Sequence, residues 1–118
     1  MKLKKSIKSY SKANGYLATE FTNIICKCAL KQFELITDDQ EEGAYVECSS
    51  CNLKIDIENS MQYMSRKTQN ICTCDCKLFT ICIGKAFYDN SNDPRWIYIG
   101  AECLKCGLGG VYIDWHER

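Results

Sequence analysis

The sequence predicts a small, mostly β protein, built as two tandem antiparallel units that share one small core and contain little helix. Three observations lead to this fold class. Eight of the ten cysteines fall into four close pairs. Short alternations of apolar and polar residues lie between these pairs. The order of pairs and alternations recurs along the chain. A chain of 118 residues suits one compact domain or two very small ones that need additional links.

The individual elements follow from alternation and turn signals. Residues 1–22 form a basic N-terminal segment. Residues 1–15, which hold its lysines, are interpreted as solvated, in the form of a short helix or a frayed end. Residues 58–70 are polar and are expected to link two halves. Residues 38–43 and 89–94 are dense in polar turn formers and predict two hairpin connections. Six segments alternate as strands do: 31–36, 44–47, 53–57, 78–87, 95–102 and 111–115.

The cysteine spacing indicates an internal duplication, with a first repeat at 23–57 and a second at 71–118. Two constant offsets support it, of 48 residues for the first pair of each repeat and 55 for the second. Cys72 and Cys82 have no counterpart in this register, so we interpret them as small, partly buried residues. Because Cys72 and Cys74 also form a Cys-x-Cys pair, a register shifted by two residues stays open.

Four thiolates at tetrahedral angles complete the coordination shell of a zinc ion. Each repeat holds one Cys-x-Cys and one Cys-x-x-Cys pair, and the latter is followed by Asn52 or Gly107, which tolerate positive φ. The sequence therefore predicts two structural zinc ions (Zn²⁺), each with no open coordination position. The predicted ligands are Cys26, Cys28, Cys48 and Cys51 for one ion, and Cys74, Cys76, Cys103 and Cys106 for the other.

Whether the cysteines bind a metal or form disulfides depends on the cellular compartment of the protein. The N-terminus has lysines but no apolar run of signal-peptide length, and no stretch approaches the roughly 20 apolar residues of a membrane helix. We therefore expect a cytoplasmic protein with no membrane partner. Disulfides are rare in such a compartment. A disulfide framework, an iron site, reduced structural thiols and a pairing of ligands crossed between the repeats remain alternatives.

Catalytic patterns are not found, so we expect the protein not to be an enzyme. His116 is the single histidine and lies near the end of the chain. No GxSxG, HExxH, P-loop or GxGxxG motif occurs. Cys74 and Cys76 could oxidise as a close pair, so a redox or metal-handling protein is a further alternative.

A hairpin placed between two cysteine pairs, over about residues 24–57 and 71–115, resembles the zinc-ribbon family. The resemblance implies short antiparallel strands around each ion, although the Cys-x-Cys first pair departs from the usual ribbon. Residues 95–115 are similar to a stretch of small bacterial proteins, some of which accompany polymorphic toxins as immunity proteins. That resemblance implies a cytosolic, non-catalytic protein that binds another protein.

The chain as a whole is neutral, because Lys plus Arg and Asp plus Glu both number 15. Local clusters of charge offer two candidate binding surfaces. An acidic first hairpin is either a solvated turn or a surface that steers a basic protein, such as a toxin domain. The predicted partner-binding residues are Asp38, Asp39, Glu41 and Glu42. The alternative is a nucleic-acid-associated zinc ribbon, an accessory of transcription or translation, that uses the lysines from Lys2 to Lys12.

Overall fold

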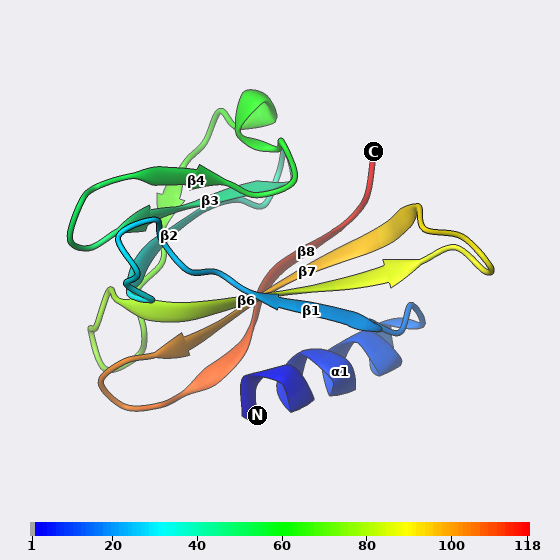
Figure 1. Cartoon of the computed structure of the whole chain (residues 1–118), viewed down its shortest axis with the longest axis horizontal. Helices are drawn as coiled ribbons and strands as arrows, with labels where there is room; N and C mark the ends of the chain where they lie inside the picture. Colours follow the sequence, from blue (N-terminus) through cyan, green and yellow to red (C-terminus); the bar gives the residue numbers. More distant parts are fainter. Residues whose placement is uncertain (1) are drawn as a thin grey trace. The chain divides into compact units, whose positions relative to one another are not determined.

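The structure is a computed structural model, and it describes residues 2–118. The described chain is mostly β and antiparallel, with one α-helix, as the sequence predicts (Figure 1). It forms two compact units. The first contains residues 2–24, Ile81–Glu102 and Gly109–Arg118, and the second contains Ile25–Thr80 and Cys103–Leu108. Because each unit gathers distant parts of the chain, its boundaries do not follow the sequence repeat.

The first unit combines α1 (Lys2–Asn14) with β1 (Glu20–Asn23), most of β6 (Phe79–Phe87), most of β7 (Pro94–Cys103) and β8 (Gly109–His116). β1 runs antiparallel to β6, and β7 runs antiparallel to β8 with a register shift after Ile99. No helix among residues 2–118 is long and apolar enough to cross a membrane.

Helix α1 is the short helix expected as one form of the N-terminal segment, but it is solvated on one face only. Leu3, Ile7 and Ser11 recur every four residues and form one buried face. Two glycines allow this face to approach the strands closely. A Cβ on Gly84 would lie 2.6 Å from Ile7 Cγ2, and one on Gly100 would lie 2.5 Å from Ile7 Cδ1. The helix therefore belongs to the core of this unit, together with Ala18, Cys82, Ala86 and Tyr98.

Polar contacts from α1 and the segment after it hold this part of the chain against the strands. The hydroxyl of the fully buried Tyr98 donates to the carbonyl of Tyr16 at 2.7 Å and accepts a hydrogen bond from Asn14 at 3.0 Å. The carboxylate of Asp114 accepts from Tyr10 and from Trp96, both at 2.8 Å. The bond to Asp114 raises the pKa of Tyr10 to about 12.

The second unit holds β2 (Phe33–Asp38), β3 (Gly43–Cys48) and β4 (Lys54–Asp56), which lie in the order β4, β3, β2. The predicted polar linker at 58–70 contains a short 3-10 helix, η1 (Met61–Tyr63), and β5 (Thr68–Gln69), which pairs with β2. Fully buried apolar side chains of this unit are Phe33, Leu35, Val46, Ile57 and Phe79.

One strand pair joins the two sequence repeats within the second unit. Phe33 of β2 lies opposite Phe79 of β6 in an antiparallel pair, and both side chains are fully buried. Equivalent backbone bonds flank this pair, from Ser49 N–H to the Gln32 carbonyl at 3.0 Å and from Leu104 N–H to the Leu78 carbonyl at 3.1 Å. The two repeats therefore pair at equivalent residues, and the paired phenylalanines are buried.

Candidate metal centres

The first Cys-x-Cys turn is closed by its own backbone. The N–H of Cys26 donates to the carbonyl of Leu30 at 2.9 Å, and the N–H of Ala29 donates back to the carbonyl of Cys26 at 2.8 Å. Ala29 takes a φ of 74°, a left-handed conformation. This tight turn directs the side chains of Cys26 and Cys28 to one site.

The second repeat forms the same turn two residues earlier than the predicted register. The N–H of Cys72 donates to the carbonyl of Cys76 at 2.9 Å, and the N–H of Asp75 donates to the carbonyl of Cys72 at 2.8 Å. Asp75 has a φ of 72°. Cys72 and Cys74 therefore correspond to Cys26 and Cys28, whereas Cys76 takes the position of Leu30.

The two Cys-x-x-Cys turns are also equivalent, and they confirm the predicted need for positive φ. Asn52 has a φ of 62° and donates its N–H to the carbonyl of Cys48, while Gly107 has a φ of 77° and donates to that of Cys103. These bonds measure 3.1 and 3.0 Å. Both turns place two cysteine side chains on the inner side of a bend.

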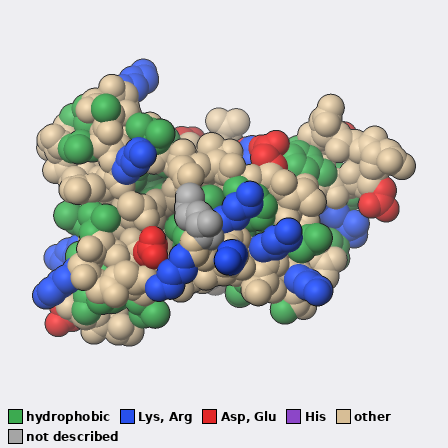
Figure 2. All heavy atoms as spheres, turned by 60° about the horizontal axis from the view of Figure 1, so that its bottom comes forward, with side chains coloured by type: hydrophobic (Ala, Val, Ile, Leu, Met, Phe, Trp, Pro, Cys, Tyr) green, Lys and Arg blue, Asp and Glu red, His purple; other side chains and the backbone are tan. Residues whose placement is uncertain are grey.

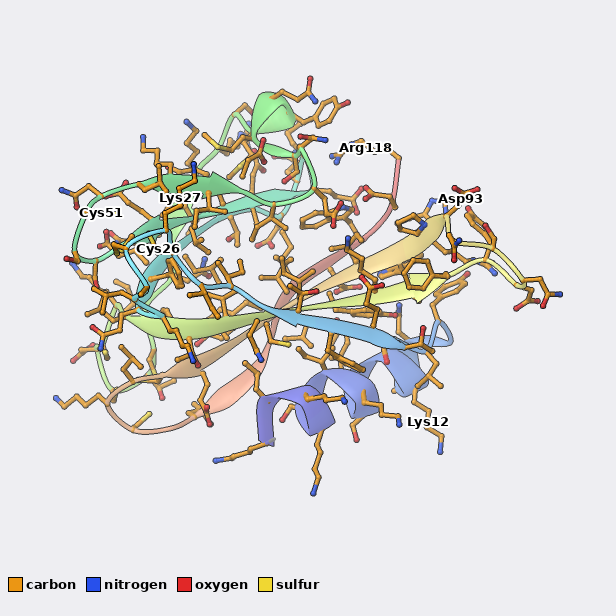
Figure 3. The ribbon with its side chains drawn as sticks, in the orientation of Figure 1. Lys12, Cys26, Lys27, Cys51, Asp93 and Arg118 are labelled. Carbon is orange, nitrogen blue, oxygen red and sulfur yellow. The ribbon has the colours of Figure 1, made fainter. Side chains whose placement is uncertain are left out.

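Four cysteines of each repeat gather into one group in the second unit, with sulfur atoms within 4.8 Å of one another. We call these the two four-cysteine groups. The first consists of Cys26, Cys28, Cys48 and Cys51, and the second of Cys72, Cys74, Cys103 and Cys106. Figure 3 shows Cys26 and Cys51 next to each other, with their sulfur atoms 3.4 Å apart. The other short sulfur–sulfur distances are 3.6 Å for Cys28 to Cys48, 3.4 Å for Cys72 to Cys106 and 3.5 Å for Cys74 to Cys103.

These distances suit a metal and not a disulfide. A disulfide needs about 2.05 Å between its sulfurs, whereas a tetrahedral shell with Zn–S near 2.3 Å places them about 3.8 Å apart. The two four-cysteine groups are consistent with two structural zinc sites, and each takes its ligands from a single repeat. The crossed arrangement therefore does not occur among the described residues.

Cys76 was therefore wrongly predicted as a ligand, and Cys72 takes its place. The Sγ of Cys76 lies 3.6 Å from the carbonyl of Leu78, outside the group. The sequence does contain a signal for the shifted register, since an isoleucine precedes both Cys26 and Cys72 at a common offset of 46 residues. Cys82 joins neither group, as predicted, and desolvation raises the pKa of its buried thiol.

Backbone amides favour the thiolate form of Cys48 in the first group and of Cys72 and Cys103 in the second. The N–H groups of Cys106 and Lys105 point at the sulfur of Cys103, at 3.5 and 3.3 Å, and lower its pKa to about 6. The N–H groups of Cys51 and Ser50 lower the pKa of Cys48 to about 6 in the same way. Since zinc binds the thiolate, these turns favour the form that coordinates the ion.

Asp38, one of the four predicted partner-binding residues, does not lie on an exposed acidic surface. Asp38 is buried, and its carboxylate accepts the N–H groups of Ser65 and Arg66 at 2.8 Å and of Glu41 and Gln40 at 3.1 Å. These bonds, led by that of Ser65, lower the pKa of Asp38 to about 2. Asp38 therefore organises the hairpin and cannot meet a partner.

The other acidic residues of that surface are placed differently. Asp39, Glu41 and Glu42 follow Asp38 in the turn between β2 and β3, and all three are exposed. Their location on the turn agrees with the prediction of a polar hairpin connection. Whether they bind a partner stays a prediction.

Together, these features define a mostly β, antiparallel protein with two four-cysteine groups suited to zinc. Comparison with protein-family models, with curated proteins and with solved structures finds no match. The resemblances to zinc ribbons and to immunity proteins therefore stay predictions, and any proposal of function rests on the residues themselves.

Proposed function

We propose that this protein is not an enzyme and acts by binding another protein, with two structural zinc ions that hold the binding surface rigid. Four sulfurs fill each zinc shell and leave no position for an activated water or a substrate. The binding energy of such ions goes into the fold, because the site does not exist in the unfolded chain.

The observation that carries this proposal is a set of exposed aliphatic side chains at equivalent positions beside both four-cysteine groups. Ile25 and Ile71 directly precede the first cysteine of each group and are 55% and 50% exposed. Leu53 and Leu108 follow the last cysteine by two residues and are 37% and 52% exposed. Single exposed aliphatic residues are common, but recurrence of one pattern at two rigid turns favours a protein contact.

Charge then suggests the kind of partner. Asp39, Glu41 and Glu42 are exposed on one turn of the same unit as the four-cysteine groups. Negative charge at the rim of an interface accelerates association with a basic protein. A basic toxin domain inhibited by this chain, as an immunity protein would do, is the form of partner that we propose.

Binding kinetics with the product of the adjacent gene test this proposal. Replacing Ile25 and Ile71 by Ser should mainly raise the dissociation rate, since it removes apolar contact from the centre of an interface. Both replacements leave every cysteine in place, so zinc content should stay at two ions per chain.

Charge reversal in the same complex distinguishes electrostatic steering, which changes the association rate, from direct contact, which changes the dissociation rate. Reversing Asp39, Glu41 and Glu42 to Lys should slow association about tenfold or more at low salt, with a small effect on dissociation. Reversal of three acidic residues elsewhere is the matched control: Glu20, Asp93 and Glu117. An absence of binding, or binding indifferent to all of these variants, contradicts the proposal.

A second candidate function, nucleic-acid binding, is favoured by one observation on α1. Its lysines are all exposed, and the helix contains no acidic residue. Figure 2 turns α1 toward the reader and shows Lys and Arg side chains gathered on that face. A pocket of about 500 Å³ lies there, lined by Lys5, Lys8, Ser9, Lys12 and Leu17.

Fluorescence anisotropy with single-stranded and duplex oligonucleotides tests this second candidate. Binding through the lysines should weaken steeply with salt, and Lys5→Gln, Lys8→Gln and Lys12→Gln should each reduce the slope of log affinity against log salt by about one. Affinity that does not change with these substitutions excludes the α1 surface as the contact.

A further inference from the structure

A second pocket of the first unit, of about 380 Å³, is lined by a single arginine together with polar, aromatic and aliphatic residues. One wall is the segment that follows α1, from Gly15 to Thr19, and another is the end of β6 with the turn after it. Arg95, near the start of β7, completes the lining. We call this the Arg95 pocket, and it is separate from the four-cysteine groups, which belong to the second unit.

Aromatic rings hold the Arg95 guanidinium in place. Its Cζ lies 4.4 Å from the ring centroid of Tyr16 and 5.2 Å from that of Tyr88. Tyr16 is itself stacked on Trp96, with centroids 4.6 Å apart and planes 6° from parallel. The hydroxyl of Tyr88 is hydrogen-bonded to His116 at 3.2 Å. These contacts keep the guanidinium ordered without any acidic partner.

The guanidinium lacks the counter-charge that a partly desolvated arginine normally has. Within residues 2–118 it makes no hydrogen bond or ion pair, and its Nε is buried without an acceptor. A desolvated donor of this kind is costly when it has no acceptor. A planar carboxylate can accept two parallel hydrogen bonds from the terminal Nη1 and Nη2 groups of the guanidinium and would supply the missing counter-charge there, while Nε stays buried.

The other residues that line the pocket favour a ligand with one negatively and one positively charged group. Asp89 lines the same pocket, yet its carboxylate forms no ion pair with Arg95. A dianionic phosphate would be repelled by Asp89, whereas a carboxylate with a nearby ammonium would satisfy both side chains. Asn90 and Thr19 line the pocket too, and their side chains are available to donate hydrogen bonds.

We propose that the Arg95 pocket binds a small zwitterion of the amino-acid class, with its carboxylate on Arg95 and its ammonium group toward Asp89. This inference is independent of the protein-binding function proposed above. It assigns a small-molecule site to a different unit of the chain.

The test is an NMR titration of the full-length, zinc-loaded protein at constant ionic strength. Four probes separate the parts of the ligand: L-alanine, N-acetyl-L-alanine without the ammonium, L-alaninamide without the carboxylate, and inorganic phosphate. We expect saturable shifts of the Arg95 Nε–Hε signal and of the pocket amides with L-alanine, weaker binding of N-acetyl-L-alanine and no saturation with L-alaninamide. Millimolar affinity is reasonable for so few ligand atoms.

Two variants and one control make the test specific. Arg95→Lys keeps the charge but loses the fork, and should weaken L-alanine about tenfold. Asp89→Asn lies on an exposed turn and should weaken L-alanine but not N-acetyl-L-alanine. Lys31→Gln, an exposed residue of the second unit outside the pocket lining, should leave the binding of L-alanine unchanged. No saturable shift up to about 50 mM, tighter binding of phosphate than of L-alanine, or binding unaffected by both pocket variants would overturn the proposal.

Discussion

Replacement of Cys72 and of Cys76 by Ser should have opposite effects on the zinc content. The structure places Cys72 in the second four-cysteine group and leaves Cys76 outside it. The zinc content of Cys72→Ser should therefore fall from two ions per chain to one when a chelator competes, while Cys76→Ser should retain two. Cys26→Ser is the matched control, because Cys26 occupies the equivalent position of the first group.

The size of the effect follows from the ligand shell. Loss of a residue that merely supports a ligand weakens metal binding about 10–100-fold, so loss of one of four thiolates should weaken it by at least about 100-fold. That factor corresponds to about 2.7 kcal/mol. Since metal binding stabilises only the folded chain, the free energy of unfolding of Cys72→Ser should decrease by a similar amount.

Native mass spectrometry after dialysis against a chelator counts the ions, and urea denaturation measures the stability. Two ions in Cys72→Ser together with one in Cys76→Ser would restore the register in which Cys76 is the ligand. One ion in both variants would also refute the reasoning, because it would mean that five cysteines contribute to the second site.

Four further predictions concern the fold and its polar contacts. Complete removal of zinc should unfold the second unit, and circular dichroism that is unchanged by a strong chelator would contradict this. Ile7→Ala should lower the free energy of unfolding by about 2–5 kcal/mol in urea, since Ile7 is fully buried on α1. Asp38→Asn should accelerate hydrogen exchange of the four amides bound by its carboxylate, whereas Asp39→Asn should not. Asp114→Asn should lower the Tyr10 pKa from about 12 toward its usual 10, as followed by tyrosinate absorbance. The stability contributed by that raised pKa is present below pH 10 and is lost as the pH rises to about 12, so equal alkaline titration of both proteins would contradict it.

The sequence predicted the β class and most of the cysteines that gather in the two four-cysteine groups, because both depend on short-range patterns. Alternating apolar residues define strands wherever one face is buried, as Phe33 and Leu35 show. A Cys-x-x-Cys turn followed by Asn52 or Gly107 is a local structure, and its geometry is encoded within a few residues. Seven of the eight predicted ligands accordingly lie in the two four-cysteine groups.

The predictions that the structure corrected concern residues whose local sequence fits two different arrangements. Cys72-Thr-Cys74-Asp-Cys76 contains two overlapping Cys-x-Cys pairs, and spacing alone does not choose between them. The backbone turn that ends at Cys76 makes the choice. Asp38 resembled its acidic neighbours in sequence, and only the approach of residues 65 and 66 from a distant part of the chain buries it.

The sequence by itself therefore determined the strand-rich class, the duplication and the chemistry of two sulfur-rich sites, because adjacent residues carry that information. Tertiary structure decided which thiols converge and that α1 packs through Ile7 against glycines of distant strands. It also decided that Arg95 contacts the rings of Tyr16 and Tyr88, with no acid among residues 2–118 paired to it. Each of these depends on residues that are far apart along the chain, and their contacts form only when the backbone has folded and excluded water from the space between them.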